Sequence, residues 1–367
     1  MKHLVRRVGQ RFMVGFQGHE ASKDVKHLIR EYGVGSVILF ARNVDAPEQL
    51  AELVRELQET AKDAGHDLPL LVTVDQEGGR VARLREPWTL WPPLRVVGQA
   101  GSEEHARAMG AALAEELAAC GIRCDFAPVM DVDTNPKNPV IGDRSFGSDP
   151  EQVGRLGVAM IRGLQEKGVA ACAKHFPGHG DTDVDSHLEL PAVDHSPSRL
   201  RDVELRPFRM AIQAGVAAVM TCHVLVRELD DARPATLSPD VVDALLRKEL
   251  RFDGVVFTDD MDMKAVAKHW PAEQAAVLAA KAGCDVLSMC ANHDAQVRAL
   301  EGVIRAVESE EISTTALDDS CDRVKRLKQR YLLPYVAPDP KRARAAAGAA
   351  VRGALSREIS ERAGVQA

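Results

Sequence analysis

The sequence predicts an α/β fold in which eight parallel strands close into a single (β/α)8 barrel, followed by a C-terminal helical extension. One phrase recurs along the chain: an amphipathic stretch, a glycine near its end, and a short apolar run rich in β-branched residues. The glycine suits the position just after a helix, and an apolar run without alternation suits a strand buried on both faces. Helices between successive strands imply parallel pairing, and eight such strands indicate a closed barrel.

Eight segments are strand candidates, the first RFMVGF at residues 11–16 and the last KAGCDVLSMC at residues 281–290. Between them lie EYGVGSVILF, LPLLVTVD, AACGIRCDFAPVMDV, QEKGVAACAKHF, IQAGVAAVMTCHV and RFDGVVFTDDM. Helical patterns separate most of them, for example at residues 47–65, 102–121 and 149–168, and several open with Ser, Asp or Pro. A doubly wound open sheet is the alternative, but no G-x-G-x-x-G follows the first strand.

The chain of 367 residues is longer than a typical domain, yet one barrel of about 250 residues or more fits it. Composition changes after Leu332, where prolines are followed by an Ala/Arg-rich helical pattern. We therefore predict a barrel domain over residues 1–333 and a linker with a peripheral helix over residues 334–367. The tail has too few bulky apolar residues to form a core of its own.

Charge and composition exclude several classes of partner. The net charge is −7 and no Lys/Arg stripe is present, which argues against nucleic acid. The N-terminus has no apolar signal region, and no apolar run is long enough to span a bilayer. The seven cysteines, scattered from Cys120 to Cys321, are expected to be reduced and mostly buried. We expect a cytoplasmic monomer that acts on a small molecule without a metal or other cofactor.

Polar residues gather at one place in the predicted fold, the C-terminal ends of the strands, where barrel active sites are built. This group consists of Asp75, Asp131, Lys174, His175, His223, Asp259 and Asp260. Any one of them alone would be explained as a loop charge or a capping residue. Their shared location favours a single site.

The segment KHFPGHGDTDVDSHLELP, at residues 174–191, could bind calcium, bind zinc or transfer protons. A calcium loop starting at Asp181 would need Gly at Ser186 and Glu at Ala192, so calcium is disfavoured. Zinc binding by a helical His pair is disfavoured because Pro and Gly separate the histidines. Zinc in a loop stays open, in a metal-dependent hydrolase with the ligands His175, His179, Asp181 and Asp185.

A proton-transfer arm explains the segment better. Asp185 and His187 are two positions apart, so in an extended loop their side chains point the same way. A carboxylate fixes the tautomer of an adjacent imidazole, which makes His187 a proton shuttle near neutral pH. Pro177, Gly178 and Gly180 would form the hinge of a closing arm. A surface histidine with a chance Asp neighbour is the alternative.

Two further segments supply a carboxylate and ligand contacts. Alternation along VVFTDD puts Asp259 on the side of Phe257 and Asp260 on the other, without showing which side faces a pocket. Two solvated loop acids are the alternative. Asp75 with Arg80 and Arg83 offers the acceptors and donors that a polyhydroxylated ligand needs. A long loop adds Arg144, with Phe146 as a candidate surface for stacking on a sugar ring.

Together with DQEGGRVARL, NPVIGDRSFG and VVFTDDMDM, the segment at residues 174–191 resembles the β-N-acetylhexosaminidases of glycoside hydrolase family 3. The likeness is to the bacterial cytosolic type that recycles cell-wall sugars, and it runs from about Val8 to Leu333. It implies a (β/α)8-like barrel that removes terminal β-linked N-acetylglucosamine with retention of configuration. The aglycone stays open between peptidoglycan-derived sugars or muropeptides and chitin fragments.

The resemblance also implies residue roles. Asp259 corresponds to the nucleophile, His187 to the general acid/base and Asp185 to its orienting partner. The contacts to the nonreducing-end sugar correspond to Asp75, Arg83, Arg144, Lys174 and His175. Asp262 departs from the pattern, which has a small polar residue there. A β-glucosidase, a β-xylosidase or a sugar-binding protein without activity is the alternative, although the Asp-Ser-His arm favours the N-acetyl sugar.

Overall fold

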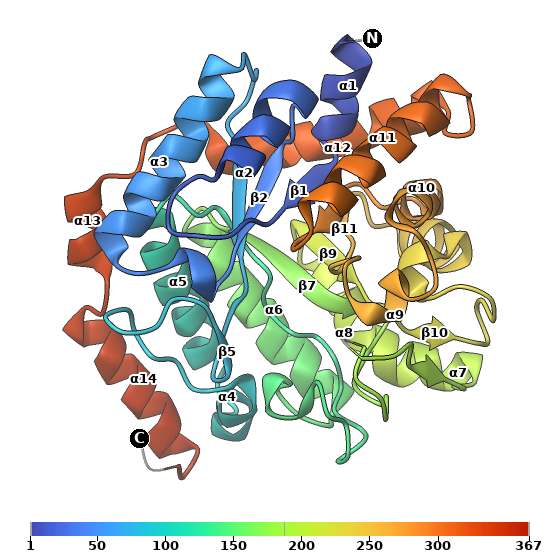
Figure 1. Cartoon of the computed structure of the whole chain (residues 1–367). Helices are drawn as coiled ribbons and strands as arrows, with labels where there is room; N and C mark the ends of the chain where they lie inside the picture. The colour runs from blue at the N-terminus through green and yellow to red at the C-terminus, as the bar shows by residue number, and fades with distance from the viewer. Residues whose placement is uncertain (1, 187, 366–367) are drawn as a thin grey trace.

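Eight parallel strands form a closed ring at the centre of the protein, in a computed structural model that describes residues 2–186 and 188–365 (Figure 1). Their order around the ring is β11-β9-β7-β6-β3-β2-β1-β12. The ring closes between β11 and β12, where Thr258 N donates to Val286 O at 3.0 Å and Val286 N donates to Val256 O at 3.0 Å. The predicted barrel is confirmed, and the open-sheet alternative is wrong.

All eight predicted strand segments contain a strand of the ring. These strands are β1 (Phe12–Val14), β2 (Ser36–Leu39), β3 (Leu71–Val74), β6 (Cys124–Asp125), β7 (Ala170–Phe176), β9 (Ala218–Thr221), β11 (Val255–Phe257) and β12 (Leu287–Met289). Two small additional sheets lie in the loops, formed by the pairs β4 (Gln76–Gly78) with β5 (Val81–Ala82) and β8 (Ala192–Val193) with β10 (Leu225–Val226).

Helices surround the ring. The α-helices are α1 (Lys2–Gly9), α2 (Lys23–His27), α3 (Pro47–Asp63), α4 (Leu94–Ala100), α5 (Glu103–Ala119), α6 (Pro150–Glu166), α7 (Pro197–Arg199), α8 (Leu205–Gln213), α9 (Lys264–Ala267), α10 (Ala272–Ala282), α11 (His293–Glu308), α12 (Thr314–Leu332), α13 (Pro340–Ala346) and α14 (Ala350–Arg362). Short 3-10 helices occur at residues 41–43, 142–144 and 235–237, and π-helices occur at residues 28–32, 200–204 and 240–249. The start signals predicted for two helices are confirmed, because Ser102 caps α5 and Asp149 caps α6.

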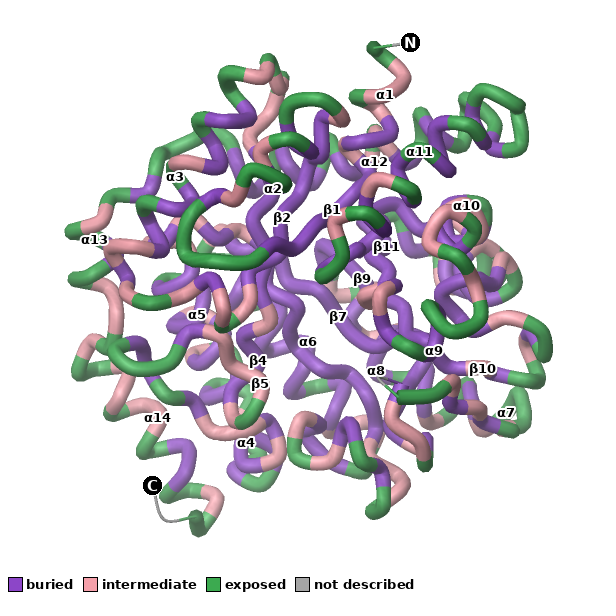
Figure 2. The backbone as a smooth tube through the Cα atoms, viewed as in Figure 1, coloured by how far each residue is buried: buried purple, intermediate pink, exposed green. Residues whose placement is uncertain are grey.

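The strands are buried on both faces, which appears as the continuous buried centre in Figure 2. One set of alternate side chains fills the ring and includes Leu71, Cys172, Met220 and Phe257. The other set faces the helices. Helix α12 closes the N-terminal end of the ring, since its residues Val324, Leu327, Tyr331 and Leu332 belong to the interior cluster. The barrel interior is therefore a packed core, and its C-terminal end is where barrel active sites are built.

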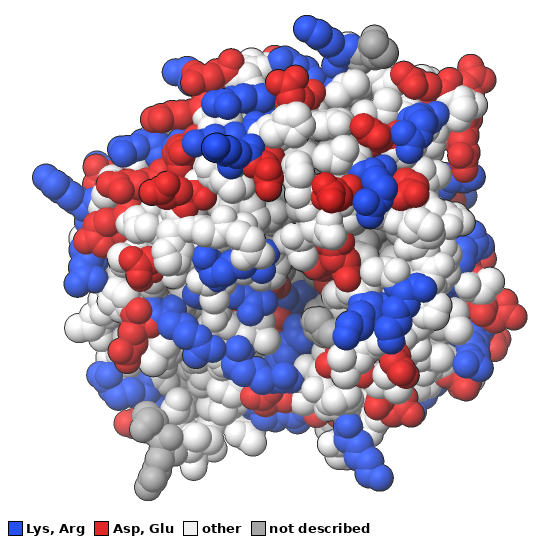
Figure 3. Space-filling view, viewed as in Figure 1, with Lys and Arg blue, Asp and Glu red and all other residues white. Residues whose placement is uncertain are grey.

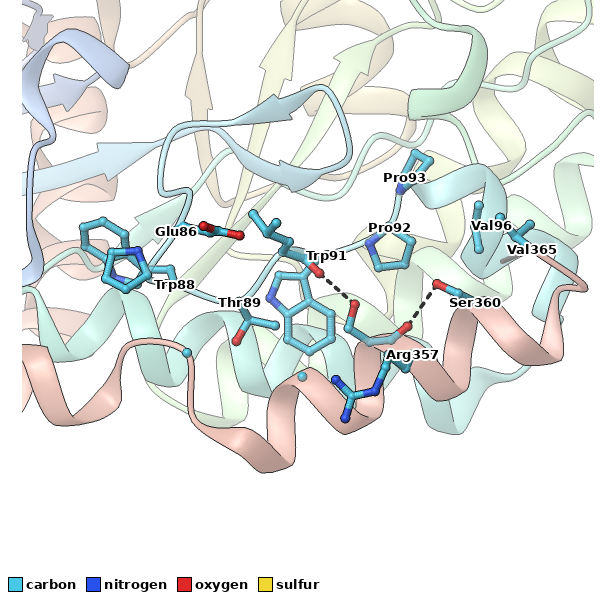
Figure 4. Close-up of a pocket in the computed structure, with 15 residues that line it drawn as sticks. Glu86, Trp88, Thr89, Trp91, Pro92, Pro93, Val96, Arg357, Ser360 and Val365 are labelled. Atoms are coloured by element: carbon cyan, nitrogen blue, oxygen red, sulfur yellow. Dashed lines mark hydrogen bonds between the residues drawn. The ribbon is translucent and has the colours of Figure 1, made fainter. Parts of the chain in front are cut away.

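The tail beyond residue 333 forms two short helices, where the sequence predicted one. Gly348 lies between them at φ +63°, and a Cβ there would lie 2.1 Å from Pro87 O. Helix α13 packs on α3, while α14 packs on α4 and α5. Figure 4 shows α14 beside the loop that carries Trp88 and Trp91, where Ser356 Oγ donates to Leu90 O at 2.7 Å. The division of the chain after residue 333 stays a prediction.

The state of the cysteines and the lack of a long apolar run were both expected from the composition. All seven cysteines are free thiols, and only Cys321 is not fully buried, so that prediction is confirmed. Within residues 2–186 and 188–365, no helix has the length and apolar character needed to cross a bilayer.

The close approach of α5 and α6 leads to a stability prediction. A Cβ at Gly163 would lie 2.1 Å from Arg107 O, so Gly163→Ala must push two helix backbones apart. We expect a loss of about 1–3 kcal/mol in the free energy of unfolding, despite the better helix propensity of alanine. Urea unfolding monitored by circular dichroism measures it.

Gly353→Ala on α14 is the matched control. The nearest atom to its new Cβ is Arg357 Nη1 at 3.6 Å, so the added methyl group has room. This variant should gain about 0.5–1 kcal/mol from helix propensity alone. A similar gain for Gly163→Ala would contradict the packing described for α5 and α6.

Candidate active site

On three strands, the side chains that point into the ring are followed, at the C-terminal end, by a charged side chain on the same face. The inward series of β3, β7 and β11 lead to Asp75, Lys174 and Asp259 respectively, because alternate residues of a strand share a face. All three line one cavity of about 280 Å³. In Figure 3, Lys and Arg side chains gather around a hollow at the centre of the face in view.

The cavity brings together seven of the eight residues to which the family resemblance assigned a role. They are Asp75, Arg83, Arg144, Lys174, His175, Asp185 and Asp259. The eighth, His187, lies outside the described residues. Its neighbours Asp185 and Ser186 both line the cavity.

Lys174 is the central cation of the site and is 1% exposed. Its Nζ lies 2.8 Å from Asp75 Oδ1 and 2.6 Å from Glu77 Oε1, and Arg83 Nη2 donates to Asp75 Oδ2 at 3.1 Å. Burial alone would raise the pKa of Asp75, but Lys174 and Arg83 hold that pKa well below its usual range. Burial likewise opposes the charge of Lys174, yet Asp75 and Glu77 raise the pKa of its ammonium.

Glu77 is a buried member of this network that the sequence analysis missed. Its carboxylate receives Arg144 in a bidentate pair, with Nε to Oε2 at 2.9 Å and Nη2 to Oε1 at 2.7 Å. Burial would raise the pKa of Glu77, but Arg144 and Lys174 lower it to about 2. Glu77 stands two positions after Asp75, and that spacing was the available signal. Glu77 thus holds Arg144 and Lys174 in fixed positions.

His175 is oriented by Asp131 on one side and Arg144 on the other. Its Nδ1 lies 2.7 Å from Asp131 Oδ2, and Arg144 Nη2 lies 3.3 Å from its Nε2. Because a guanidinium only donates, Nε2 is the acceptor and the ring proton sits on Nδ1. Asp131 also accepts from the backbone N of His179 at 2.7 Å, which fixes the start of the arm.

The arm after β7 is packed at its base. The ring of His179 bridges Thr182 Oγ1 at 2.8 Å and Ser186 Oγ at 3.0 Å. Burial lowers the pKa of His179 to about 4. A Cβ at Gly180 would lie 1.9 Å from Val132 O, so the expected hinge is tightly enclosed. Pairing of β8 with β10 ties the far end of the arm. Closure of the arm over a substrate stays a prediction.

The zinc alternative needs His175, His179, Asp181 and Asp185 to converge. Both ring nitrogens of His179 are engaged by hydroxyl groups, and Asp181 accepts from Thr134 Oγ1 at 2.7 Å. In the part of the chain that the structure describes, no three His, Cys, Asp or Glu side chains are grouped so as to hold a metal ion. The residues proposed as zinc ligands are therefore not assembled as a set.

The two aspartates after β11 have different surroundings. Asp259 follows the inward residue Phe257 and lines the main cavity, whereas Asp260 does not line it. Asp260 Oδ1 accepts from Cys290 N at 3.1 Å and from Asp262 N at 3.0 Å. Burial, Asp262 and Asp259 together raise the pKa of Asp260 to about 7. Asp262 itself accepts from Ala291 N at 2.8 Å, so this departure from the family pattern braces the loop after β12.

The stacking surface expected at Phe146 is not there. Phe146 is 1% exposed and packs in the core between the ring and its helices. An aromatic ring near the site comes instead from Phe40, at the end of β2. It lines a second cavity of about 210 Å³ that shares Asp75, Arg83 and Asp259 with the first. The guanidinium of Arg42 lies over this ring at 4.2 Å from its centroid.

Comparison with known proteins agrees with this architecture. The family model described as "Glycosyl hydrolase family 3 N terminal domain" matches residues 3–327. A β-hexosaminidase of Thiobacillus denitrificans is 41% identical over 287 residues, which is 77% of this chain and 78% of that protein. One of Alkalilimnicola ehrlichii is 41% identical over 297 residues, covering 78% of this chain and 82% of that protein.

Two solved structures are also similar. The glycoside hydrolase family 3 β-N-acetylglucosaminidase from Paenibacillus sp. str. FPU-7 has a TM-score of 0.91 and 43% identity, covering 98% of this chain and 68% of that one. NagZ from Neisseria gonorrhoeae in complex with N-trifluoroacetyl-D-glucosamine has a TM-score of 0.79 and 31% identity, covering 96% and 98%. With the matched family model and these relatives, the chain belongs to glycoside hydrolase family 3.

Proposed function

We propose that the protein is an exo-acting β-N-acetylglucosaminidase that removes terminal β-linked N-acetylglucosamine with retention of configuration. The observation that carries this proposal is one cavity whose wall combines Asp259 with a fixed set of charged donors and acceptors. The activity named for the relatives agrees with it. The proposed setting is the cytoplasm, where a monomer would act on peptidoglycan-derived sugars.

Recognition of the terminal sugar rests on the buried network. Asp75 offers acceptor oxygens, while Arg83, Arg144 and Lys174 offer donors, as the hydroxyl groups of a sugar require. Their mutual ion pairs hold these side chains in place before substrate arrives. Binding the sugar therefore costs little side-chain conformational entropy. The cavity has a volume of about 280 Å³, and α12 closes the opposite end of the ring. Such a cavity suits one terminal sugar residue better than the interior of a sugar chain.

Catalysis would proceed in two displacements. Asp259 attacks the anomeric carbon, the bond to the leaving oxygen breaks, and His187 gives its proton to that oxygen. Water then opens the glycosyl-enzyme ester as His187 takes back a proton, which releases the sugar and restores Asp259. Asp185 would orient His187. The support for this pair is the position of Asp185 and Ser186 on the cavity wall.

Asp260 supports the role of Asp259 as the nucleophile. A pKa raised to about 7 leaves Asp260 mostly uncharged below that pH, so two adjacent negative charges do not compete for the same space. Its backbone N also donates to Asp259 Oδ1 at 2.8 Å, which fixes the orientation of that carboxylate. The proposed nucleophile is therefore held by the backbone of the neighbouring residue.

Asp259→Asn tests the nucleophile. The amide cannot form the glycosyl ester, so hydrolysis of an aryl N-acetylglucosaminide should fall on the order of a thousandfold or more. The wild type should cleave this substrate, leave the corresponding aryl glucoside intact and keep its activity in a chelator. Asp253→Asn is the matched control and should stay active, because Asp253 is exposed, pairs with Arg326 and does not line the cavity. Substantial activity in Asp259→Asn would contradict the assignment.

His187→Ala tests the acid role. Loss of the proton donor should slow N-acetylglucosaminides with poor leaving groups by about 10²–10⁴-fold, and activated aryl substrates much less. Steady-state rates on a series of leaving groups give the dependence. His195→Ala, just beyond the arm, is the control, because His195 Nε2 lies 3.2 Å from Asp181 Oδ2 and His195 does not line the cavity. Equal losses on all substrates would exclude His187 as the acid.

A further inference from the structure

A third cavity, of about 560 Å³, lies at the end of the barrel opposite the candidate active site. Its wall includes Gln10, Gly33 and Leu68, which precede β1, β2 and β3, and residues of α12 from Cys321 to Lys328. The N-terminal ends of the strands thus face this cavity, whereas Asp259 lies beyond their C-terminal ends. The packed interior of the ring separates the two sites.

The walls of this cavity are basic, although the whole chain carries a net charge of −7. The charged or titratable side chains that line it are His3, Arg6, Arg7, His66, Asp67, Lys325 and Lys328. Arg7 is paired with Asp318 at the rim. When Lys328 is protonated, four cations thus face the carboxylates of Asp67 and Asp318, namely Arg6, Arg7, Lys325 and Lys328. This leaves a surplus of two positive charges when both histidines are neutral.

Lys328 is a buried lysine whose ammonium is bonded to a neutral oxygen and not to a carboxylate. It is 1% exposed, and its Nζ donates to Gln10 Oε1 at 2.8 Å. Gln10 Nε2 donates to Gly33 O at 2.8 Å, which fixes that amide with its oxygen toward the lysine. An ammonium has three N–H donors, and a buried one needs an anion to offset the loss of water.

Lys174 is equally buried but differs from Lys328 in its partners. Both lysines are 1% exposed, but Lys174 has two carboxylates within 2.8 Å. Around Lys328, no carboxylate of the described residues lies within ion-pair distance. Burial accordingly lowers the pKa of Lys328 to about 7, and the nearby charges of Lys328 and Arg6 add to the effect of burial in lowering the pKa of His66. Among the described residues that line this cavity, Asp67 is therefore the one carboxylate, and Lys328 has no carboxylate partner.

We infer that this cavity binds a small phosphate monoester, with the phosphate on Lys328 and the organic part against Leu68 and Val324. A phosphate dianion carries about −1.5 to −2 charges near neutral pH, which matches the surplus better than a single carboxylate does. Arg6 is held at the rim, where Nη1 donates to Gly65 O at 3.1 Å, so a cation already stands at the entrance. The site is independent of the proposed hydrolase chemistry.

Isothermal titration of the full chain with glycerol phosphate tests this inference. N-acetylglucosamine is added in excess so that the basic groups of the candidate active site are occupied. We expect one binding site in the wild type, and binding weakened by about tenfold or more in Lys328→Met. Lys248→Met, which removes an exposed lysine on residues 240–249, is the matched control and should bind as the wild type does.

Two further measurements keep the test decisive. Lys328→Met should retain hydrolase activity, and if it does not fold, Lys325→Met on the exposed side of α12 should weaken binding instead. Glycerate, the carboxylate counterpart of the probe, should bind more weakly than glycerol phosphate. The inference is overturned if the wild type does not bind glycerol phosphate, if Lys328→Met or its substitute binds it equally well, or if glycerate binds as tightly.

Discussion

Closure of the ring between β11 and β12 is the constraint on which the site depends. The hydrogen bonds that Val286 makes with Val256 and Thr258 bring the last two strands into register, so alternate positions on every strand point to one axis. Asp75, Lys174 and Asp259 meet at that axis although they come from distant parts of the chain. An open sheet of the same strands would spread these side chains along an edge and leave them unpaired.

The charges gathered in this way neutralise one another. Asp75 and Glu77 on one side, and Lys174 and Arg144 on the other, are each held by at least one partner of opposite sign. Burying any one alone would cost several kcal/mol, but together they form a rigid, polar wall. Such a wall can stabilise developing charge without reorganising. Lys328, at the opposite end of the barrel, has the same burial without such compensation.

Much of this architecture was predictable from the sequence, because parallel strands and their helices leave strong patterns. The strand-end position of Lys174 and Asp259 was enough to predict that they share a site. The inward direction of Asp259 was not, since both faces of its strand are apolar and only ring closure defines an inside. Glu77 was missed because it lies in β4, a three-residue strand of a Gly-rich hairpin that follows β3. Phe146 was misjudged because loop residues can fold back into the core.

In the proposed mechanism, Asp259 forms the covalent link to the sugar. A ring-fluorinated N-acetylglucosaminyl fluoride slows both displacements while its good leaving group lets the first one proceed, so the glycosyl-enzyme accumulates. Mass spectrometry of the intact protein, followed by peptide mapping, then locates the attached sugar. We expect one sugar per chain, on Asp259. Attachment to any other side chain, or continued turnover with no labelled protein, would contradict it.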